Sequence, residues 1–321
     1  MTSASPLLSV RGLRTSFAGP QGQVTVLDGV DLDVARGESL GIVGESGSGK
    51  SLMLLSVLGL VKPPGRVEAR AIIFDGKELE PGSSPGRLRA EGMALIMQDA
   101  LTALNPSLTI GTQIDEALAR HAGLRRGREQ RERAEELMRL VGIPEPARRL
   151  AAYPHELSGG QRQRAMIAAA LACAPKLLVA DEPTTALDVT VQAQVLDLIA
   201  EMRERLGMGL VLITHNLGVV AEYCERVAVV YAGEIVESGP AVEVIASPRH
   251  PYTAGLLAAL PRHDRLDDPI APIPGMVPSP GERPTGCRFA DRCALRSTPC
   301  DLPQALRPAG PSRLARCHLV S

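Results

Sequence analysis

The residues Gly44–Ser51 have the composition and spacing of a phosphate-binding loop. Their pattern, Gly-x-x-x-x-Gly-Lys-Ser, follows an apolar run typical of a strand and precedes the helix-like run Leu52–Leu55. Glycines let the backbone wrap around phosphates, and the amide groups at the following helix N-terminus attract anions. In such a loop Lys50 reaches the β- and γ-phosphates, and the Ser51 hydroxyl binds Mg²⁺. The pattern predicts a nucleoside triphosphate site, with a chance match at a glycine-rich turn as the alternative.

Two carboxylates follow a second apolar run. Lys176–Ala180 is typical of a buried strand, and Asp181 and Glu182 stand at its end. In proteins with a phosphate-binding loop, an acid at this point holds Mg²⁺, usually through the water shell of the ion, and this role suits Asp181. Glu182 could take a proton from an attacking water. The alternative is that both acids only begin a turn before Pro183.

A serine and two glycines begin a helix in the segment Leu157–Gln161, Leu-Ser-Gly-Gly-Gln. Ser158 is a natural N-cap, and the glycines leave the first N–H groups accessible to a second anion. His215 follows the apolar strand Gly209–Ile213, on the edge where open α/β sheets bind ligands, so it could position a γ-phosphate. An ordinary helix start and a structural histidine are the alternatives.

Strand and helix patterns alternate around these residues, so they predict a sheet with a helical insertion in the middle of the chain. The predicted strands are Leu7–Phe17, Val24–Leu27, Val30–Val34, Ser39–Val43, Val67–Phe74, Gly92–Met97, Val227–Tyr231 and Glu234–Glu237. The predicted helices are Thr109–Ala122, Arg125–Val141, Gln161–Cys173 and Val189–Leu206. An adenine ring could stack on Phe17, although a core or edge-strand phenylalanine is the alternative.

The sequence changes in character after His250–Thr253. Seven prolines follow at positions 261, 269, 272, 274, 278, 280 and 284, which predict a linker or an extended, wrapping segment. Four of the six cysteines come next, Cys287, Cys293, Cys300 and Cys317. They lack the close pairs that zinc sites favour, and four thiolates could hold a [4Fe–4S] cluster, with zinc and free thiols as alternatives. Cys173 and Cys224 are expected to be ordinary buried thiols.

The composition excludes several classes of protein. The 321 residues are 45% hydrophobic and 2% aromatic, and carry a net charge of −1, so they lack the basic footprint of a nucleic-acid binder. The first residues do not resemble a signal peptide, and no apolar run approaches the ~18 residues that span a bilayer. We therefore expect a cytosolic protein that meets any membrane through partners, with unpaired cysteines.

Taken together, the motifs resemble those of the ATP-binding subunit of ABC transporters. Gly44–Ser51 is similar to Walker A, Gln98 to the Q-loop, Leu157–Gln161 to the ABC signature and Leu177–Glu182 to Walker B. Ala186–Asp188 is similar to the D-loop, His215 to the switch histidine and Phe17 to the aromatic residue that stacks on adenine. The order of these motifs along the chain is also that of the family.

A narrower resemblance is to the ATPases of dipeptide and oligopeptide importers. The segments Gln98–Pro106 and His250–Thr253 carry it, together with the proline- and cysteine-bearing tail. Ala100 replaces the usual proline, Met97 a common phenylalanine, and Asn216 follows the switch histidine where the family has aspartate. None of these departures removes a catalytic group.

This resemblance implies an α/β fold, namely a P-loop NTPase core with a mostly parallel sheet, an antiparallel β subdomain and a helical insertion. It divides the chain into a nucleotide-binding domain over residues 1–255, with the helical subdomain at about 99–160, and a proline- and cysteine-rich extension over 256–321. The tail also resembles one in the family that is thought to carry a [4Fe–4S] cluster.

For the site, the resemblance implies ATP and Mg²⁺ as cofactors. The catalytic residues would be Glu182, His215, Lys50 and Gln98. The nucleotide would contact Phe17, Gly44, Glu45, Ser46, Gly47, Ser48, Gly49, Lys50, Ser51, Leu52, Gln98 and Asp181. The Mg²⁺ ligands would be Ser51, Gln98 and Asp181. Two subunits would close head to tail, and Ser158, Gly159, Gly160, Gln161 and Asp188 would act on the ATP of the partner subunit.

The implied partners are two membrane permease subunits, a second ATP-binding subunit that is a paralogue, and an extracytoplasmic solute-binding protein, with no nucleic acid. The chain would lie at the cytoplasmic face of the cell membrane. Two alternatives remain open. The same type of ATP-hydrolysing subunit could drive the import of another small solute, such as nickel, a glycoside or an opine. A non-transport ABC ATPase of translation or DNA repair is disfavoured, because tandem cassettes and long coiled-coil inserts are lacking.

Overall fold

The computed structural model of the protein describes residues 5–19, 22–82, 92–124, 127–184, 188–260 and 272–320. These residues form two units. The first unit combines both ends of the chain, up to residue 83 and from residue 212 onward, and the second holds residues 84–211. Both units mix strands with helices, as the sequence predicts.

An antiparallel sheet begins the first unit. It consists of β1 (Leu8–Gly19), β2 (Gly22–Val34), β4 (Arg66–Glu68), β5 (Ala71–Phe74) and β6 (Lys77–Glu78). The order is β2-β1-β5-β6, and β4 also pairs with β1. The prediction of two short strands within residues 24–34 was wrong, because a single strand runs through them. Gly29 has a φ of 67°, so the chain passes this point as an irregularity of the strand instead of a turn.

A second group of strands in the first unit includes β3, which leads into the phosphate-binding loop. It contains β12 (Arg307–Pro308), β13 (Leu314–Ala315), β11 (Glu234–Pro240), β10 (Arg226–Tyr231) and β3 (Ser39–Val43), in that order. The next strand is β9 (Gly209–Thr214), of which the part from residue 212 onward belongs to this unit. The β3–β10 pair is parallel, whereas β11 runs antiparallel to both β10 and β13. All five residues of β3 are buried, which explains its continuous apolar pattern.

Four helices are described in the first unit. They are α1 (Lys50–Val57), α9 (Leu217–Tyr223), α10 (Ala241–Ala246) and α11 (Pro251–Ala258). Helix α9 packs closely on β3, because a Cβ atom at Gly41 would lie 2.6 Å from Cγ1 of Val220. The close packing of α9 therefore requires a glycine at this place in β3.

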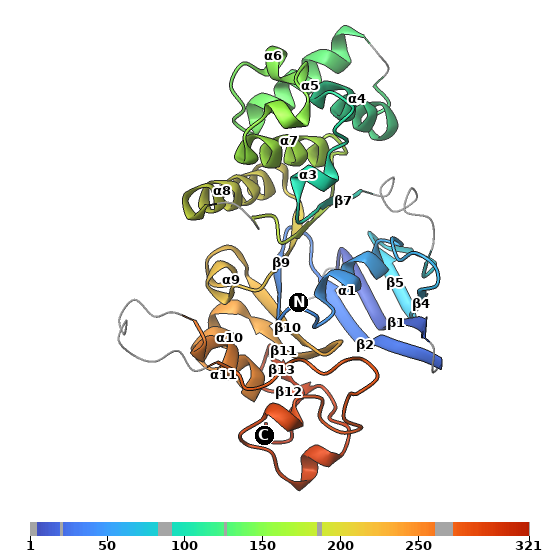
Figure 1. The fold of residues 1–321 in the computed structure, drawn as a ribbon, viewed down its shortest axis with the longest axis vertical. Helices are drawn as coiled ribbons and strands as arrows, with labels where there is room; N and C mark the ends of the chain where they lie inside the picture. The colour runs from blue at the N-terminus through green and yellow to red at the C-terminus, as the bar shows by residue number, and fades with distance from the viewer. Residues whose placement is uncertain are drawn as a thin grey trace. The chain divides into compact units, whose positions relative to one another are not determined.

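The C-terminal extension, described from residue 272 to residue 320, is mostly irregular and wraps one end of the first unit (Figure 1). Its regular elements are the 3₁₀ turns η2 (Ala290–Arg292) and η3 (Thr298–Asp301) and the short strands β12 and β13. This agrees with the extended segment that the prolines predict, although Pro261 and Pro269 lie outside the described residues. Strand β13 covers the edge of β11, so the extension adds a strand to this sheet of the first unit.

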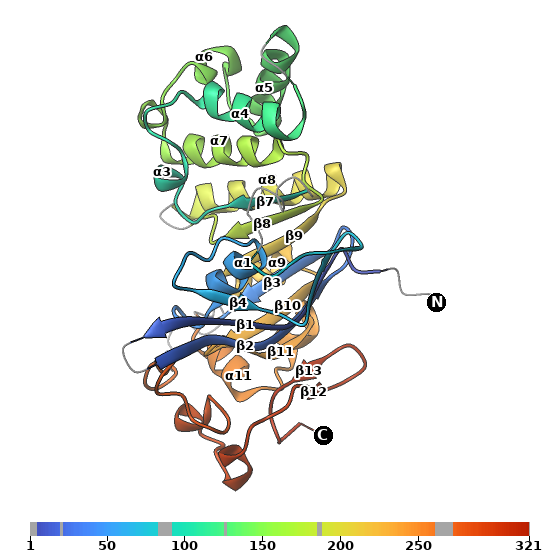
Figure 2. The same ribbon diagram turned by 90° about the vertical axis from the view of Figure 1, so that its right-hand side faces the viewer.

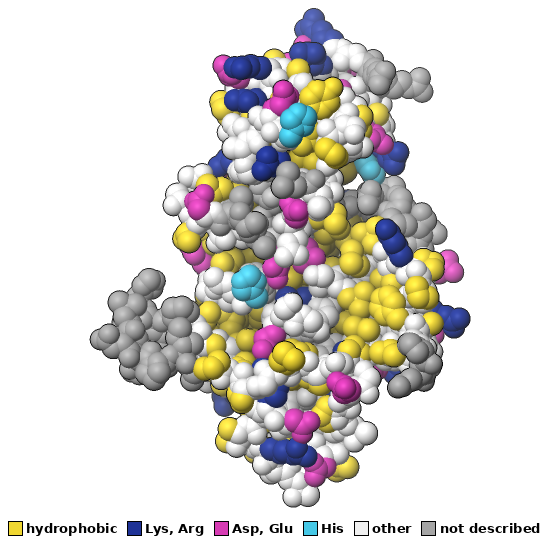
Figure 3. All heavy atoms as spheres, in the orientation of Figure 1, with side chains coloured by type: hydrophobic (Ala, Val, Ile, Leu, Met, Phe, Trp, Pro, Cys, Tyr) yellow, Lys and Arg dark blue, Asp and Glu magenta, His cyan; other side chains and the backbone are white. Residues whose placement is uncertain are grey.

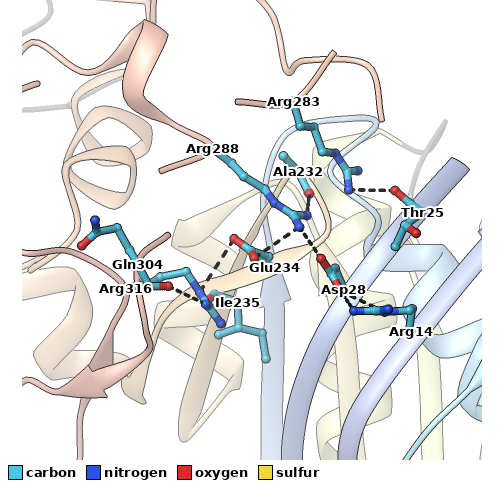
Figure 4. Close-up of polar contacts among 10 residues, drawn as sticks. All are labelled: Arg14, Thr25, Asp28, Ala232, Glu234, Ile235, Arg283, Arg288, Gln304 and Arg316. Atoms are coloured by element: carbon cyan, nitrogen blue, oxygen red, sulfur yellow. Dashed lines mark hydrogen bonds and ion pairs between the residues drawn. The ribbon is translucent and has the colours of Figure 1, made fainter. Parts of the chain in front are cut away.

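Arginines of the extension fasten it to the strands (Figure 4). Arg288 forms ion pairs with Asp28 of β2 and Glu234 of β11, at 2.9 and 3.3 Å. Arg283 donates to the Thr25 carbonyl at 3.1 Å, and Arg316 donates to the Ile235 carbonyl at 3.0 Å. A fully buried pair adds to these, since Arg313 lies 2.7 Å from the Glu237 carboxylate.

His250 links this region to α11. Its ring Nδ1 accepts a hydrogen bond from the Tyr252 amide at 3.1 Å and caps the helix. Its backbone N–H donates to the Glu237 carboxylate at 2.9 Å. Burial lowers the pKa of His250 to about 4. The folded protein therefore holds a neutral imidazole at pH values where the unfolded chain, with a pKa near 6.5, is protonated.

We expect the free energy of unfolding to decrease as the pH falls from 6.5 to 4. The contribution of His250 is complete above pH 6.5 and is lost through this window, by at most about 3 kcal/mol. Denaturant titrations at several pH values measure it. His250→Asn keeps a capping side chain without a titrating group, and it should flatten the curve in this window. An unchanged pH dependence in that variant would contradict the assignment to His250.

The second unit is a helical layer beside two parallel strands, β7 (Met93–Ile96) and β8 (Leu177–Asp181) (Figure 2). Its helices are α3 (Ala100–Ala103), α4 (Ile110–His121), α5 (Arg128–Leu140), α6 (Pro146–Leu150), α7 (Gly159–Leu171) and α8 (Val189–Leu206), with the 3₁₀ turn η1 (Pro154–Glu156). Helix α7 contacts α3, α4, α5 and α8, and so forms the centre of the unit. The predicted helix start at Arg125 lies outside the described residues.

Side chains at the helix starts explain where these helices begin. The hydroxyl of Thr109 accepts the Thr112 amide at the start of α4, and the carboxylate of Asp188 accepts the Val191 amide at the start of α8. Gly207 ends α8 with a φ of 64°, a conformation that glycine adopts without strain.

The surface of the first unit carries hydrophobic side chains over the antiparallel strands and α1 (Figure 3). Within the part of the chain that the structure describes, no helix combines the length and the apolar character needed to cross a bilayer. The division of the chain at residues 255 and 256 stays a prediction; the extension shares its unit with the amino-terminal strands.

Candidate functional site

The phosphate-binding loop connects β3 to α1 in the first unit. Gly44, Gly47 and Gly49 have φ values of 154°, 78° and 105°, which few other residues adopt. A Cβ atom at Gly44 would lie 2.2 Å from the Val230 carbonyl oxygen, so the loop also has no room for a side chain there. The sequence pattern and the geometry therefore agree on a tight, glycine-dependent curl before the N-terminus of α1.

The Lys50 side chain lies inside this curl. Its ammonium group donates to the carbonyls of Gly44 and Glu45, at 2.7 and 3.0 Å, and the residue is buried. Ser48 is also fully buried, and its Oγ has no hydrogen-bond partner among the described residues. The loop thus concentrates a cation and helix-terminal amides at one point, which is the electrostatics of a phosphate site.

Glu45 is held from outside the loop, by residues that the sequence analysis did not assign to the site. Its amide donates to the Tyr252 hydroxyl at 2.8 Å. Its two carboxylate oxygens accept from the two terminal nitrogens of Arg292, at 2.7 and 2.9 Å. Burial raises the pKa of Tyr252, and the Glu45 carboxylate raises that of Arg292, so the phenol stays neutral and the guanidinium charged.

An aromatic cluster surrounds this contact. The rings of Tyr231, Tyr252 and Phe289 lie 4.6 to 5.4 Å apart between centroids, and the Arg292 guanidinium lies 5.7 Å from the Tyr231 ring. Only 4 tyrosines and 3 phenylalanines occur in the chain, so three of the seven meet here. The scarcity of aromatic residues and the segment His250–Thr253 were the sequence signals that could have indicated this cluster.

Phe17 and His215 complete the predicted site residues of the first unit. Phe17 is half-buried on β1, and its ring faces Gly65, where a Cβ atom would lie 2.8 Å from Cε1. His215 is exposed between β9 and the N-cap Asn216 of α9. Both side chains are at least partly exposed, and the nucleotide contacts of both residues stay predictions.

The second unit carries the two acidic residues at the end of β8. Asp181 is the last residue of the strand, and Glu182 follows with a φ of 44°. This left-handed conformation is costly for glutamate and is typical of functional positions. The Gln98 amide, just past β7, donates to the Glu182 carboxylate at 3.3 Å. Two residues predicted for one reaction are therefore in contact.

The helix start at Ser158 is a complete capping box. The Ser158 hydroxyl accepts the Gln161 amide, and the Gln161 side chain accepts the Ser158 amide, at 3.3 and 3.2 Å. Ser158, Gly159, Gly160, Gln161 and Asp188 line one open hollow of the second unit. The structure therefore brings together all five residues predicted for the partner's ATP, while Ala186 and Leu187 lie outside the described residues.

The four cysteines of the extension also gather. Cys287, Cys293, Cys300 and Cys317 line one small pocket, where Nδ1 of His318 lies 3.6 Å from Sγ of Cys300. Burial raises the pKa of Cys287 to about 11 and raises those of Cys293 and Cys317, so these thiols are protonated at neutral pH. Among the described residues, no three histidine, cysteine or acidic side chains are arranged to hold a metal ion.

The two remaining cysteines differ in burial. Cys224 is 8% exposed at the end of α9, as predicted. Cys173 is only half-buried, and the prediction of a buried thiol was wrong for this residue. It follows the last turn of α7 and lines a groove of the second unit, so one side of its helix end faces solvent.

Comparison with known proteins gives the class of this site. Residues 27–185 match the family described as ABC transporter, and residues 236–300 match that described as oligopeptide/dipeptide transporter, C-terminal region. A cassette of Clostridium perfringens, cbiO1, superposes with a TM-score of 0.63 and 29% identity over 76% of this chain and 92% of its own. The dimeric bacterial cassette MJ0796 superposes with a TM-score of 0.64 and 29% identity, over 73% of this chain and 98% of its own. Fold and site together define an ATPase of the ABC class.

Full-length relatives narrow the family. The chain is 46% identical to the dipeptide transport ATP-binding protein DppD of Escherichia coli (strain K12), over 97% of this chain and 96% of that protein. It is also 46% identical to a protein of Brucella abortus (strain 2308) named as a peptide import ATP-binding protein, over 98% and 95%. The chain belongs to the peptide-import family of ABC transporter ATP-binding proteins.

Proposed function

We propose that the chain is the ATP-binding and ATP-hydrolysing subunit of an ABC importer of dipeptides or oligopeptides. The observation that carries the proposal is the combination of two features in one chain. One is a phosphate-binding loop of the required geometry, and the other is an extension of the oligopeptide/dipeptide transporter type that contacts this loop.

In the proposed site, the first unit binds the nucleotide. The residues Gly44–Ser51 wrap the phosphates, Lys50 neutralises the β- and γ-phosphates, and Leu52 follows in the first turn of α1. Phe17 stacks on the adenine. Ser51, Gln98 and Asp181 would hold Mg²⁺, because side-chain oxygen atoms are the ligands that this ion prefers. The ion would neutralise phosphate charge.

Hydrolysis in the proposed mechanism is an in-line attack by water on the γ-phosphate. Glu182 polarises this water and accepts its proton, His215 holds the γ-phosphate end, and Lys50 stabilises the developing charge. The contact between Gln98 and Glu182 supports a joint role, since it ties the base to the residue that begins the helical insertion.

The hollow that Ser158, Gly159, Gly160, Gln161 and Asp188 line in the second unit supports a second ATP-binding subunit as partner. An anion-binding helix start that serves the ATP of another subunit requires a head-to-tail dimer. We propose a paralogue as that subunit, two permeases as the membrane partners and an extracytoplasmic solute-binding protein that delivers the peptide. The chain then works at the cytoplasmic face of the membrane.

Uptake of a labelled dipeptide tests the function. The chain is expressed with the permeases and the solute-binding protein encoded beside its gene, in cells that lack their own dipeptide ATPase. We expect ATP-dependent uptake of dipeptides or short oligopeptides, with competition by unlabelled peptide. Uptake of nickel, a glycoside or an opine in place of peptide would support the alternative substrates, and no uptake with active ATPase would contradict an importer role.

The four cysteines support a second, separate proposal, a [4Fe–4S] cluster in the extension. Four thiols that line one pocket supply the donor type of such a cluster, although among the described residues no three of them are arranged to hold a metal ion as they stand. ATP hydrolysis does not pass through this group. Iron and sulfide analysis after anaerobic purification tests it, and colourless, iron-free protein after reconstitution would leave free thiols as the explanation.

A further inference from the structure

The contact between the extension and the phosphate-binding loop is the basis of a further inference, which rests on the proposed function. The Arg292 side chain is 6% exposed and the Glu45 side chain 30%, and they form a two-pronged ion pair. Glu45 is the first residue after Gly44, within the loop. The carboxylate therefore belongs to the segment that wraps the triphosphate, although its charge has the same sign as the phosphates.

We propose that Arg292 is a positioning residue for ATP binding. It holds the Glu45 carboxylate away from the phosphates, neutralises its charge and fixes the entry of the phosphate-binding loop. A two-pronged guanidinium–carboxylate pair suits this task, because it sets direction as well as charge. Tyr252 completes the arrangement by accepting the Glu45 amide.

The surroundings show how Arg292 itself is held. Its Nε donates to the Pro274 carbonyl at 2.7 Å, and its guanidinium lies 5.7 and 5.9 Å from the rings of Tyr231 and Phe289. The turn η2 places it directly before Cys293 and after Phe289. The arginine is thus fixed before the nucleotide arrives, so little rotational freedom is lost on binding.

The arrangement predicts a defect in binding and not in the chemical step. Without Arg292, the Glu45 carboxylate is left partly buried without its cation and repels the triphosphate. We expect Arg292→Ala to raise the Kd for Mg-ATP about tenfold. The kcat of the assembled transporter should change by less than about twofold, because Arg292 does not touch the reacting atoms.

The test measures Mg-ATP binding to the purified full-length chain by calorimetry, and steady-state ATPase activity in the assembled transporter. Arg296→Ala is the matched control, because Arg296 lies in the same extension and pairs with Asp291 and Asp301 within it. This control removes the same charge and should leave the Kd unchanged. Arg292→Lys, which keeps the charge without the paired geometry, should give an intermediate Kd.

A second experiment, in the Glu45→Gln variant, distinguishes a positioning role of Arg292 from a general loosening of the extension. When Glu45→Gln is already present, the repelling charge is gone, so adding Arg292→Ala should raise the Kd by less than about threefold. A purely structural role of Arg292 would give the same loss in both backgrounds and would overturn the inference. So would a Kd for Arg292→Ala equal to that of Arg296→Ala. Absence of Mg-ATP binding by the unaltered chain would overturn the proposed function as well.

Discussion

Replacing Glu182 by glutamine should abolish peptide uptake and reduce ATP hydrolysis at least about 100-fold, the usual scale for losing a general base. Glutamine keeps the volume of the side chain and can still meet the Gln98 amide, which lies 3.3 Å from the carboxylate. It cannot accept a proton from the attacking water. Because no phosphate-binding group is changed, Mg-ATP should still bind, and the dimer should remain closed around it.

Three measurements check this prediction, namely uptake in cells, ATPase activity of the transporter, and dimer formation by size-exclusion chromatography with Mg-ATP. Glu204→Gln is the control, since it neutralises an exposed carboxylate of α8 in the same unit. It should behave as the unaltered chain. Unimpaired uptake in cells that depend on the Glu182→Gln protein would refute the role of Glu182.

Removing the buried arginine of the extension should cost about 3 to 5 kcal/mol of stability, the range for breaking a buried ion pair from one side. Glu237 is 0% exposed and accepts the amides of Arg249 and His250 as well as the guanidinium of Arg313. Arg313→Ala leaves this carboxylate without its cation. Natural domains are stable by only about 5 to 15 kcal/mol, so the loss is large.

Hydrogen exchange measured by mass spectrometry should detect this loss locally, as faster exchange over β11, β13 and the start of α11. Arg307→Ala is the control, because Arg307 is exposed on the neighbouring strand β12 and should alter stability by less than about 0.5 kcal/mol. Adding Glu237→Gln to Arg313→Ala removes the unpaired charge and should restore part of the protection. Equal exchange in Arg313→Ala and Arg307→Ala would disprove the strong contribution of the pair.

Local sequence predicts the backbone geometry of two parts of the candidate site. The phosphate-binding loop and the helix start at Ser158 depend on glycines, a cap and a neighbouring strand or helix, all within about ten residues of one another. The confirmed α/β fold follows from the same local periodicity. By contrast, β2 was divided in two, since a glycine that permits an irregular strand has the same sequence signal as a turn.

The residues that support the loop from outside could not be found in this way. Arg292 meets Glu45 across 247 residues of sequence, and Arg313 meets Glu237 across 76. The sequence around an arginine in a proline-rich tail does not predict which carboxylate it pairs with, because the pairing depends on how the tail crosses the sheet. The prediction that Cys173 is buried was wrong for a related reason, because the exposure of a residue at a helix end depends on which neighbours cover it.

The distance in sequence between Glu45 and Arg292 has a consequence for synthesis of the protein. A ribosome adds roughly 5 to 20 residues per second, so it needs roughly 12 to 50 s to extend the chain by the 247 positions from Glu45 to Arg292. Throughout that interval the loop exists without the guanidinium that holds its carboxylate. The nucleotide-binding loop is therefore among the first functional segments to be synthesised and among the last to be completed.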